Sequence, residues 1–210
     1  MNVMPLLNNE LTPELDYLKI LELYKSYAHP RDQVTKLIKS KKVIRVKKGI
    51  YILGPEFGAP YSREVLANII YGPSYVSGLS ALAFYSLIPE RVTVTSSRTP
   101  NKKKLFDTPI GRFTYSVLPI KRYCVSIDRI ELDKKRSFLI ATREKSLVEL
   151  TYKNKDIRSS TDLLDWINSM RIDTDILAKL RIGEFLALQK VFPAKTIDLF
   201  IELVRRAKNE

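Results

Sequence analysis

The chain has 210 residues, of which 45% are hydrophobic and 28% charged, proportions typical of a globular protein and not of a disordered one. Its single Cys and single His exclude a disulfide within the chain and any metal centre built on several cysteines or two histidines. The 36 Lys and Arg against 23 Asp and Glu give a net charge of +13, which favours a polyanionic partner, nucleic acid before membrane.

The positive charge is concentrated near the N-terminus. Residues 17–55 contain ten bases and two acids, whereas residues 1–16 contain three acids and no base. Residues 54–60 then hold four glycines and prolines in seven positions, which indicates a linker. We therefore expect two domains, 1–57 and 58–210.

Within the basic segment, apolar residues recur with helical spacing over 19–27 and 31–40, and Pro30 separates the two predicted helices. Two short alternating runs around Gly49, at 43–46 and 50–52, predict a hairpin with glycine at its turn. Helix, tight turn, helix and basic-tipped hairpin are typical of a winged helix-turn-helix.

A winged helix usually has one more helix ahead of these two. Only residues 11–17 are available for it, and Thr12-Pro13-Glu14 is a helix-start signal. We expect this first helix to be short or to be replaced by a strand.

The second predicted helix carries Val34, Leu37 and Ile38 on one face and basic or polar side chains on the other. In a winged helix this helix enters the major groove, and the hairpin lies along the phosphates. The alternatives are a solvated lysine-rich surface or a protein-binding module. For DNA we expect contacts from nine residues: Arg31, Gln33, Thr35, Lys36, Lys39, Lys42, Arg45, Lys47 and Lys48.

The larger part of the chain predicts mixed strands first and helices last, and therefore an α+β class. The uncharged stretch 65–89 is interrupted by a Gly-Pro-Ser turn at 72–74, which indicates two buried elements and not a membrane span. Helices are expected at 63–70, 79–87, 142–152, 161–170, 175–180, 183–191 and 194–207. Strands are expected at 75–77, 92–96, 104–106, 113–118, 125–132 and 137–141.

A search for catalytic motifs in this part finds little. Ser80 lacks the second glycine of a nucleophile elbow, and no phosphate-binding glycine loop is present in the sequence. Glu131 and Asp133 with Lys134 could belong to a metal-dependent nuclease, but a charged turn between two strands explains them more simply. His29 is expected to mark the corner between the first two helices.

Other polar residues of the larger part also have simple interpretations. Glu144 and Lys145 are expected in a solvated first helical turn, and Cys124 in the core. Arg98 and residues 102–104 form a second basic cluster, which is either a solvated loop or an additional phosphate contact. We expect no metal ion, no cofactor and no enzymatic activity.

Three segments of the chain resemble the AbiEi family of antitoxins from bacterial abortive-infection systems. Residues 31–53, RDQVTKLIKSKKVIRVKKGIYIL, resemble its recognition helix and wing. Residues 71–92, YGPSYVSGLSALAFYSLIPERV, resemble the segment after its linker. Residues 140–152, IATREKSLVELTY, resemble the start of a later family helix.

This resemblance implies a winged-helix repressor of its own operon that is also the antitoxin of a phage-defence toxin–antitoxin system. The toxin of the family is a nucleotidyltransferase encoded nearby, and direct contact with it is left open. The repressor activity belongs to the N-terminal domain and the antitoxic activity to the C-terminal domain of this non-enzymatic family. The alternatives are a winged-helix transcription factor with a ligand- or partner-binding C-terminal domain and, with less support, a DNA nuclease.

The expected location is the cytoplasm, without a membrane partner. No Lys or Arg precedes Lys19, and no long apolar core follows the first Met, so no secretory signal is visible. A single Cys also fits a reducing compartment.

Overall fold

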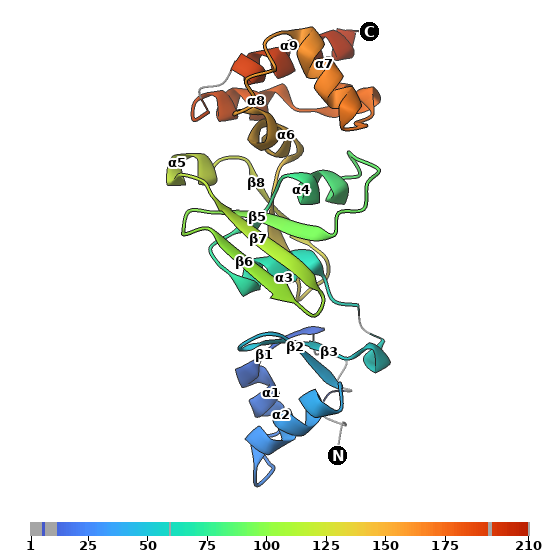
Figure 1. Ribbon diagram of the computed structural model, residues 1–210, viewed down its shortest axis with the longest axis vertical. Helices are drawn as coiled ribbons and strands as arrows, with labels where there is room; N and C mark the ends of the chain where they lie inside the picture. Colours follow the sequence, from blue (N-terminus) through green and yellow to red (C-terminus); the bar gives the residue numbers. More distant parts are fainter. Residues whose placement is uncertain (1–5, 7–11, 59, 193–194, 210) are drawn as a thin grey trace.

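The structure is a computed structural model that describes residues 6, 12–58, 60–192 and 195–209. The molecule is elongated along one axis (Figure 1). A small N-terminal unit lies at one end, a twisted sheet occupies the middle, and a group of helices lies at the other end. Helices and strands are mixed along the chain, which confirms the α+β class.

The N-terminal unit is a three-stranded antiparallel sheet with two helices. Its sheet has the order β1-β3-β2, so the first strand pairs with the last strand of the hairpin. The predicted hairpin and the second helix are confirmed. The elements are β1 (Glu14–Asp16), α1 (Tyr17–Leu23), α2 (Pro30–Lys39), β2 (Val43–Lys47) and β3 (Ile50–Leu53).

The expected alternative of a strand in place of the first helix is confirmed, because residues after the helix-start signal at Thr12 form β1. The Thr12 hydroxyl donates to the carbonyl of Glu14 at 2.8 Å and caps no helix. The cap is Asp16, whose carboxylate accepts from the backbone N–H of Lys19 at 2.7 Å. Helix α1 therefore begins at Tyr17, two residues earlier than predicted, and ends at Leu23. Residue 11 of the predicted segment lies outside the described residues.

The glycine that opens the predicted linker has a steric role. A Cβ atom on Gly54 would lie 2.4 Å from the carbonyl oxygen of Lys41. The Gly54 N–H also donates to the Lys42 carbonyl at 2.8 Å, which holds the chain end of β3 against the start of β2. A short 3-10 helix follows at Pro55–Phe57.

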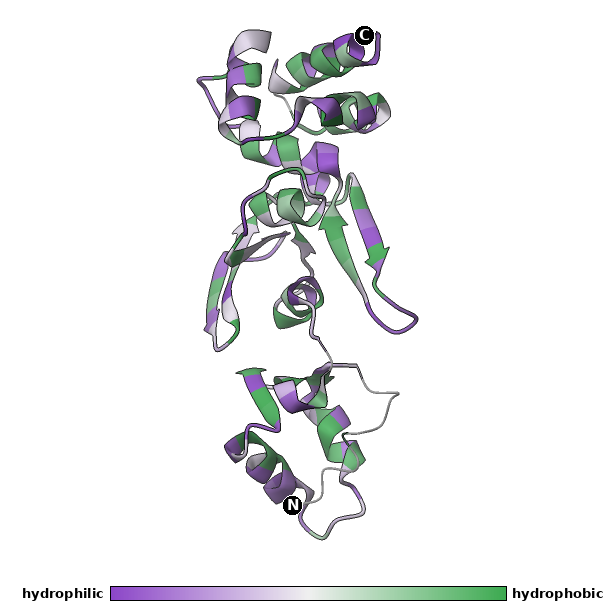
Figure 2. Cartoon of the chain, turned by 90° about the vertical axis from the view of Figure 1, so that its right-hand side faces the viewer, coloured by the Kyte–Doolittle hydropathy of each residue, from purple (hydrophilic) through white to green (hydrophobic). Residues whose placement is uncertain are grey.

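The central sheet has six strands in the order β6-β7-β5-β4-β9-β8. Helix α3 (Arg63–Ile70) lies on one face, between the two arms of the curved sheet (Figure 2), and α4 (Leu79–Phe84) and α6 (Arg143–Thr151) lie on the other. The short α5 (Ile120–Tyr123) was not predicted. The strands are β4 (Tyr75–Val76), β5 (Val94–Thr99), β6 (Lys104–Thr108), β7 (Gly111–Val117), β8 (Ile127–Glu131) and β9 (Ser137–Ala141).

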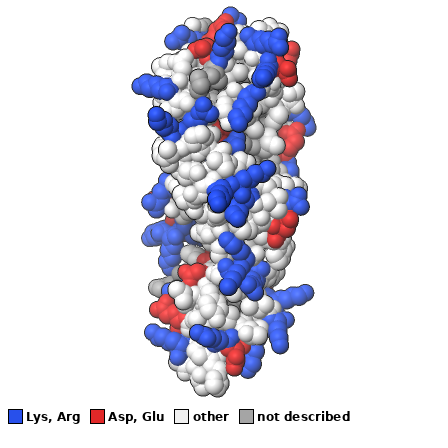
Figure 3. Space-filling view, turned by 60° about the vertical axis from the view of Figure 1, so that its left-hand side comes forward, with Lys and Arg blue, Asp and Glu red and all other residues white. Residues whose placement is uncertain are grey.

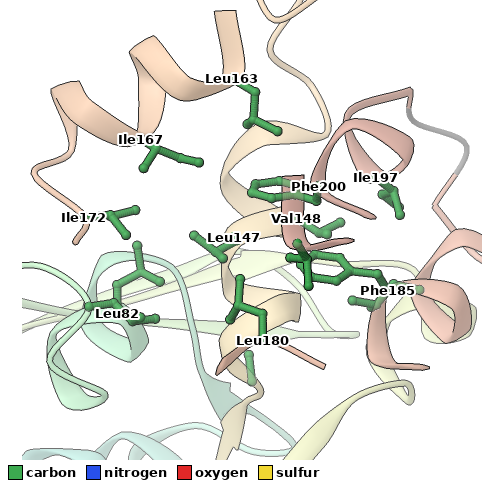
Figure 4. Packing of buried hydrophobic residues seen from close by; sticks show 14 of the residues in the cluster. Leu82, Leu147, Val148, Leu163, Ile167, Ile172, Leu180, Phe185, Ile197 and Phe200 are labelled. Carbon is green, nitrogen blue, oxygen red and sulfur yellow. The ribbon is translucent and has the colours of Figure 1, made fainter. Parts of the chain in front are cut away.

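The C-terminal helices pack around α6. Figure 4 shows Leu147 and Val148 of α6 among apolar side chains from the later helices, and the rings of Phe185 and Phe200 stack with centroids 5.3 Å apart. The predicted helix at 175–180 is a 3-10 helix, and residue 194 at the predicted start of the last helix lies outside the described residues. The elements are α7 (Ser160–Ser169), η3 (Thr174–Lys179), α8 (Ile182–Gln189) and α9 (Lys195–Asn209).

The N-terminal unit and the sheet share a hydrophobic cluster. Val46 and Ile52, from β2 and β3, are 5% and 1% exposed and belong to the same cluster as Leu66 and Ile70 of α3. The N-terminal sheet thus has helices α1 and α2 on one side and α3 on the other.

Candidate nucleic-acid interface

Helix α2 has one apolar and one basic face, and its apolar face is buried. Val34 is 2% exposed and Leu37 is 0% exposed, in a cluster that also contains Ile20 of α1. Burying each of these side chains contributes about 1.5–3 kcal/mol of transfer free energy. This burial fixes the rotation of the helix about its axis, and Lys36 and Lys39 are therefore exposed on the opposite face.

The start of α2 is set by a tight turn after α1. Pro30 occupies the first helical turn, where its missing N–H costs nothing because no partner exists for that group within the helix. His29 is the N-cap residue, and its carbonyl accepts the N–H groups of Asp32 and Gln33 at 3.2 and 3.3 Å. The prediction that His29 marks the corner between the two helices is confirmed.

The hairpin is held to α1 at its turn. Gly49 has φ +89°, a conformation that side chains other than glycine rarely adopt, and its carbonyl accepts the N–H of Tyr17 at 3.0 Å. The β2 strand also carries an irregular register between Arg45 and Lys47, so these residues do not simply alternate across the sheet.

The basic side chains predicted to contact DNA differ in their availability. Figure 3 shows Lys and Arg side chains along the whole length of one face of the molecule, where they outnumber the acidic ones. Charges without a counter-ion in the chain remain available to an anion from outside. Within the described part of the chain, five predicted contact residues are exposed and have no side-chain partner: Arg31, Lys36, Lys39, Arg45 and Lys48.

Three further predicted contact residues lie on or beside the same helix and hairpin. The exposed Thr35 donates its hydroxyl to the carbonyl of Arg31 at 3.2 Å, a bond within the helix. Lys42 forms an ion pair with Glu56 of the 3-10 helix after the hairpin. Gln33 is half-buried at the start of α2.

Lys47 differs from the other predicted contact residues because its ammonium contacts the part of the chain beyond the linker. Its Nζ donates to the carbonyl oxygen of Ile70 at 2.9 Å and lies 4.4 Å from the ring centroid of Phe106. The residue expected to lie along phosphates therefore contacts the C-terminus of α3 and strand β6.

The second basic cluster of the sequence, Arg98 with residues 102–104, does not form one surface patch in the structure. Residues 102–104 are exposed lysines in the loop before β6 and at its start. Arg98 points elsewhere: its Nε donates to Glu149 at 2.7 Å, and its Nη2 donates to the Glu149 carbonyl at 3.2 Å. Only the lysines of this cluster are thus presented on the surface.

The expected solvated turn at Glu144 and Lys145 is wrong, because both side chains are buried. Lys145 is 0% exposed, and its Nζ donates to the carbonyls of Arg122, Tyr123 and Val125 at 2.9, 2.8 and 2.5 Å. Burial lowers the pKa of Lys145 to about 8.

Glu149 and Tyr75 complete this buried polar network. Glu149 accepts from the hydroxyls of Tyr75 and Ser77 as well as from Arg98, and the Lys145 Nζ lies 4.3 Å from the Tyr75 ring centroid. Burial raises the pKa of Tyr75 above its ordinary value, and the nearby Glu149 carboxylate adds to the shift. Each buried charge has partners, so the network joins α6 to the sheet.

Glu144 is the second buried acid of α6. It is 1% exposed, accepts the backbone N–H of Arg181 at 2.8 Å and lies 3.4 Å from the Arg181 guanidinium. This contact joins the first turn of α6 to the start of α8.

The candidate nuclease residues lie at a β-hairpin turn, where Glu131 ends β8 and Asp133 and Lys134 follow in the turn. The Asp133 carboxylate accepts the N–H groups of Lys135 and Arg136 at 2.8 Å and the Arg136 Nε at 2.6 Å. The bond from the Arg136 side chain, followed by those from the backbone, lowers the pKa of Asp133. Among the residues that the structure describes, no group of three His, Cys, Asp or Glu is placed to hold a metal ion.

The remaining candidates have local structural roles. The Ser80 hydroxyl donates to the Val94 carbonyl at 3.0 Å and accepts the Ser96 N–H at 2.9 Å, which ties α4 to β5. Cys124 is exposed, so its expected place in the core is wrong. It is the C-cap of the unpredicted α5, which carries it to the surface.

No helix in the described part of the chain has the length and apolar character needed to cross a membrane. The chain matches no model of a known protein family and no curated protein.

Proposed function

We propose that residues 1–57 form a winged helix-turn-helix that binds duplex DNA, with α2 in the major groove and the β2–β3 hairpin beside it. The order strand, helix, helix, hairpin and the sheet order β1-β3-β2 support this assignment. So does the short α1–α2 turn, because a second helix held across the first is the arrangement that helix-turn-helix proteins insert into the groove.

The observation that carries the proposal is the exposed basic face of α2. Lys36 and Lys39 lie opposite the buried Val34 and Leu37, and neither has a side-chain partner within the described residues. Unpaired surface lysines on a helix of this size fit the phosphates that border a groove, and Arg31 at its N-terminal end fits a base edge.

We further propose that the protein represses its own operon and is the antitoxin of a nucleotidyltransferase-type toxin. This step rests on the resemblance of residues 31–53, 71–92 and 140–152 to the AbiEi family. Two of these segments fall in elements that join the sheet to the helices, β4–α4 and β9–α6. A ligand-responsive transcription factor is the alternative for the C-terminal part.

The first prediction tests whether α2 is the helix that enters the major groove. The double variant Lys36→Ala/Lys39→Ala should bind the DNA upstream of its own gene at least tenfold more weakly, because a hydrogen bond to a charged group contributes about 1.5–3 kcal/mol and tenfold corresponds to about 1.4 kcal/mol. Circular dichroism should show the unfolding temperature of the wild type, since both side chains are exposed.

A matched control removes the same charge elsewhere. Lys190→Ala/Lys208→Ala alters two exposed lysines at the far end of the molecule and should leave DNA affinity nearly unchanged at moderate salt. Equal affinity of the Lys36/Lys39 variant and the wild type would show that α2 is not the helix that enters the major groove.

A further inference from the structure

Lys47 occupies the end of a helix that belongs to the other part of the chain. Ile70 is the last residue of α3, and carbonyls in the last turn of a helix have no partner within it. The Lys47 Nζ donates to this carbonyl at 2.9 Å. A cation at this position also meets the negative end of the helix dipole.

The same ammonium also contacts strand β6. It lies 4.4 Å from the centroid of the Phe106 ring, a distance suited to a cation–π interaction. Phe106 packs in turn against the rings of Tyr71 and Tyr115, with centroids 6.1 and 5.8 Å apart. One side chain of the hairpin thus joins α3 and the edge strand of the central sheet.

Two other contacts hold the same junction. Val46 and Ile52 place the apolar side of the hairpin in the cluster of α3. At the opposite edge, the buried Glu14 of β1 accepts the N–H of Ser62 at 2.6 Å and lies 3.6 Å from the Arg136 guanidinium. The N-terminal sheet is therefore docked at both of its edges, at β2 through Lys47 and at β1 through Glu14.

We propose that Lys47 is a positioning residue, which docks the hairpin onto α3 and β6 so that Lys48 and Arg45 face the DNA, and that it does not itself contact phosphate. This inference rests on the proposed DNA binding. Lys48, its neighbour, is exposed without a side-chain partner in the described residues, whereas the Lys47 Nζ already donates to the Ile70 carbonyl and lies over the Phe106 ring.

The test compares the salt dependence of DNA binding in single and double variants of the full chain. Lys48→Ala should reduce the slope of log affinity against log salt by about 0.9, as expected for one lost phosphate contact. Adding Lys47→Ala to that variant should weaken binding a further three- to tenfold, roughly, with no change in slope. A further fall of about 0.9 in the slope would make Lys47 a phosphate contact and overturn the proposal.

A second readout needs no DNA. In the free protein, Lys47→Ala should speed amide hydrogen exchange at the C-terminus of α3 and in β6, whereas Lys48→Ala should not. Lys47→Arg should restore slow exchange, because a guanidinium can donate to the Ile70 carbonyl and stack on Phe106. Unchanged exchange in Lys47→Ala would refute the docking. A wild-type protein that binds no DNA would refute the proposed function and leave the exchange result to decide the docking.

Discussion

At the scale of single residues, Lys145 shows how an ammonium can be kept in the interior. Its three donors each have a backbone carbonyl, and its charge lies 3.9 Å from Glu149. The cost of desolvation is offset only while every partner is present. Any replacement that cannot donate would leave three carbonyls of the segment before β8 unsatisfied.

Lys145→Ala should therefore lower the free energy of unfolding by roughly 3–5 kcal/mol, as expected when one member of a buried charged network is removed. Urea unfolding followed by circular dichroism measures this change. The control is Lys155→Ala, an exposed lysine that should change stability by less than about 0.5 kcal/mol. Equal stabilities of the two variants would mean that the network contributes little.

The polar interior was hidden from sequence reasoning because its partners are far apart along the chain. Lys145 is satisfied by carbonyls of 122–125, and Glu149 by side chains at 75, 77 and 98. Neither the composition nor the spacing of residues indicates which distant segments will contact each other in the fold. A Glu-Lys pair after a capping threonine is ordinarily solvated, and here tertiary packing overrides that expectation.

At the scale of elements, the bounds of helices and strands were predicted best where a local sequence pattern defines them. Helix α3 and strand β9 lie at the predicted residues, because a capping serine and a clear apolar run define them. The prediction for β1 left a short helix and a strand open, because three residues are too few to show a periodic pattern. This strand is defined by its pairing with β3. Eight of the nine residues expected to contact DNA lie on α2 or the hairpin, and Lys42 lies between them. The contacts of Lys47 with α3 and β6 could not be predicted, because they depend on segments far away in the sequence.

Tyr115 joins two elements and makes stability depend on pH. It is 1% exposed on β7, its hydroxyl donates to the Ala67 carbonyl of α3 at 2.7 Å, and burial raises its pKa. Because the folded pKa exceeds the unfolded value near 10, its contribution is intact below pH 10 and is lost as pH rises further.

We expect the free energy of unfolding to fall above pH 10, with Tyr115 contributing up to about 1.4 kcal/mol per pH unit. Tyr115→Phe should be less stable by about 1 kcal/mol at pH 8, because the bond to α3 is lost. Its slope between pH 10 and 11 should be shallower than that of the wild type. The measurement is urea unfolding at pH 8, 10 and 11, and identical slopes would show that Tyr115 does not contribute.

At the scale of the whole molecule, the largest hydrophobic cluster lies entirely beyond the linker, around α6 and the C-terminal helices. This distribution supports independent folding of the larger part. The cluster around α3 draws on both parts, since Val46 and Ile52 cover that helix. Removing the N-terminal unit would leave the α3 face uncovered without disturbing the main core.

A fragment of residues 62–210 should therefore fold, with a lower free energy of unfolding than the intact chain, and should not bind the operator. If the antitoxic activity lies in this part, the fragment should still restore growth when it is expressed with the neighbouring toxin gene. Rescue by 1–57 alone would reverse the assignment. Failure of the full chain to rescue growth would favour the ligand-responsive transcription factor.

The extended arrangement in Figure 1 also determines how the protein will behave in solution. A particle stretched along one axis experiences more friction than a sphere of equal mass. The 24.2 kDa chain should therefore elute from a gel-filtration column ahead of compact standards, even as a monomer. The elution volume alone would overestimate the molar mass and suggest a dimer. Light scattering measures the molar mass independently of shape and would give the true number of chains.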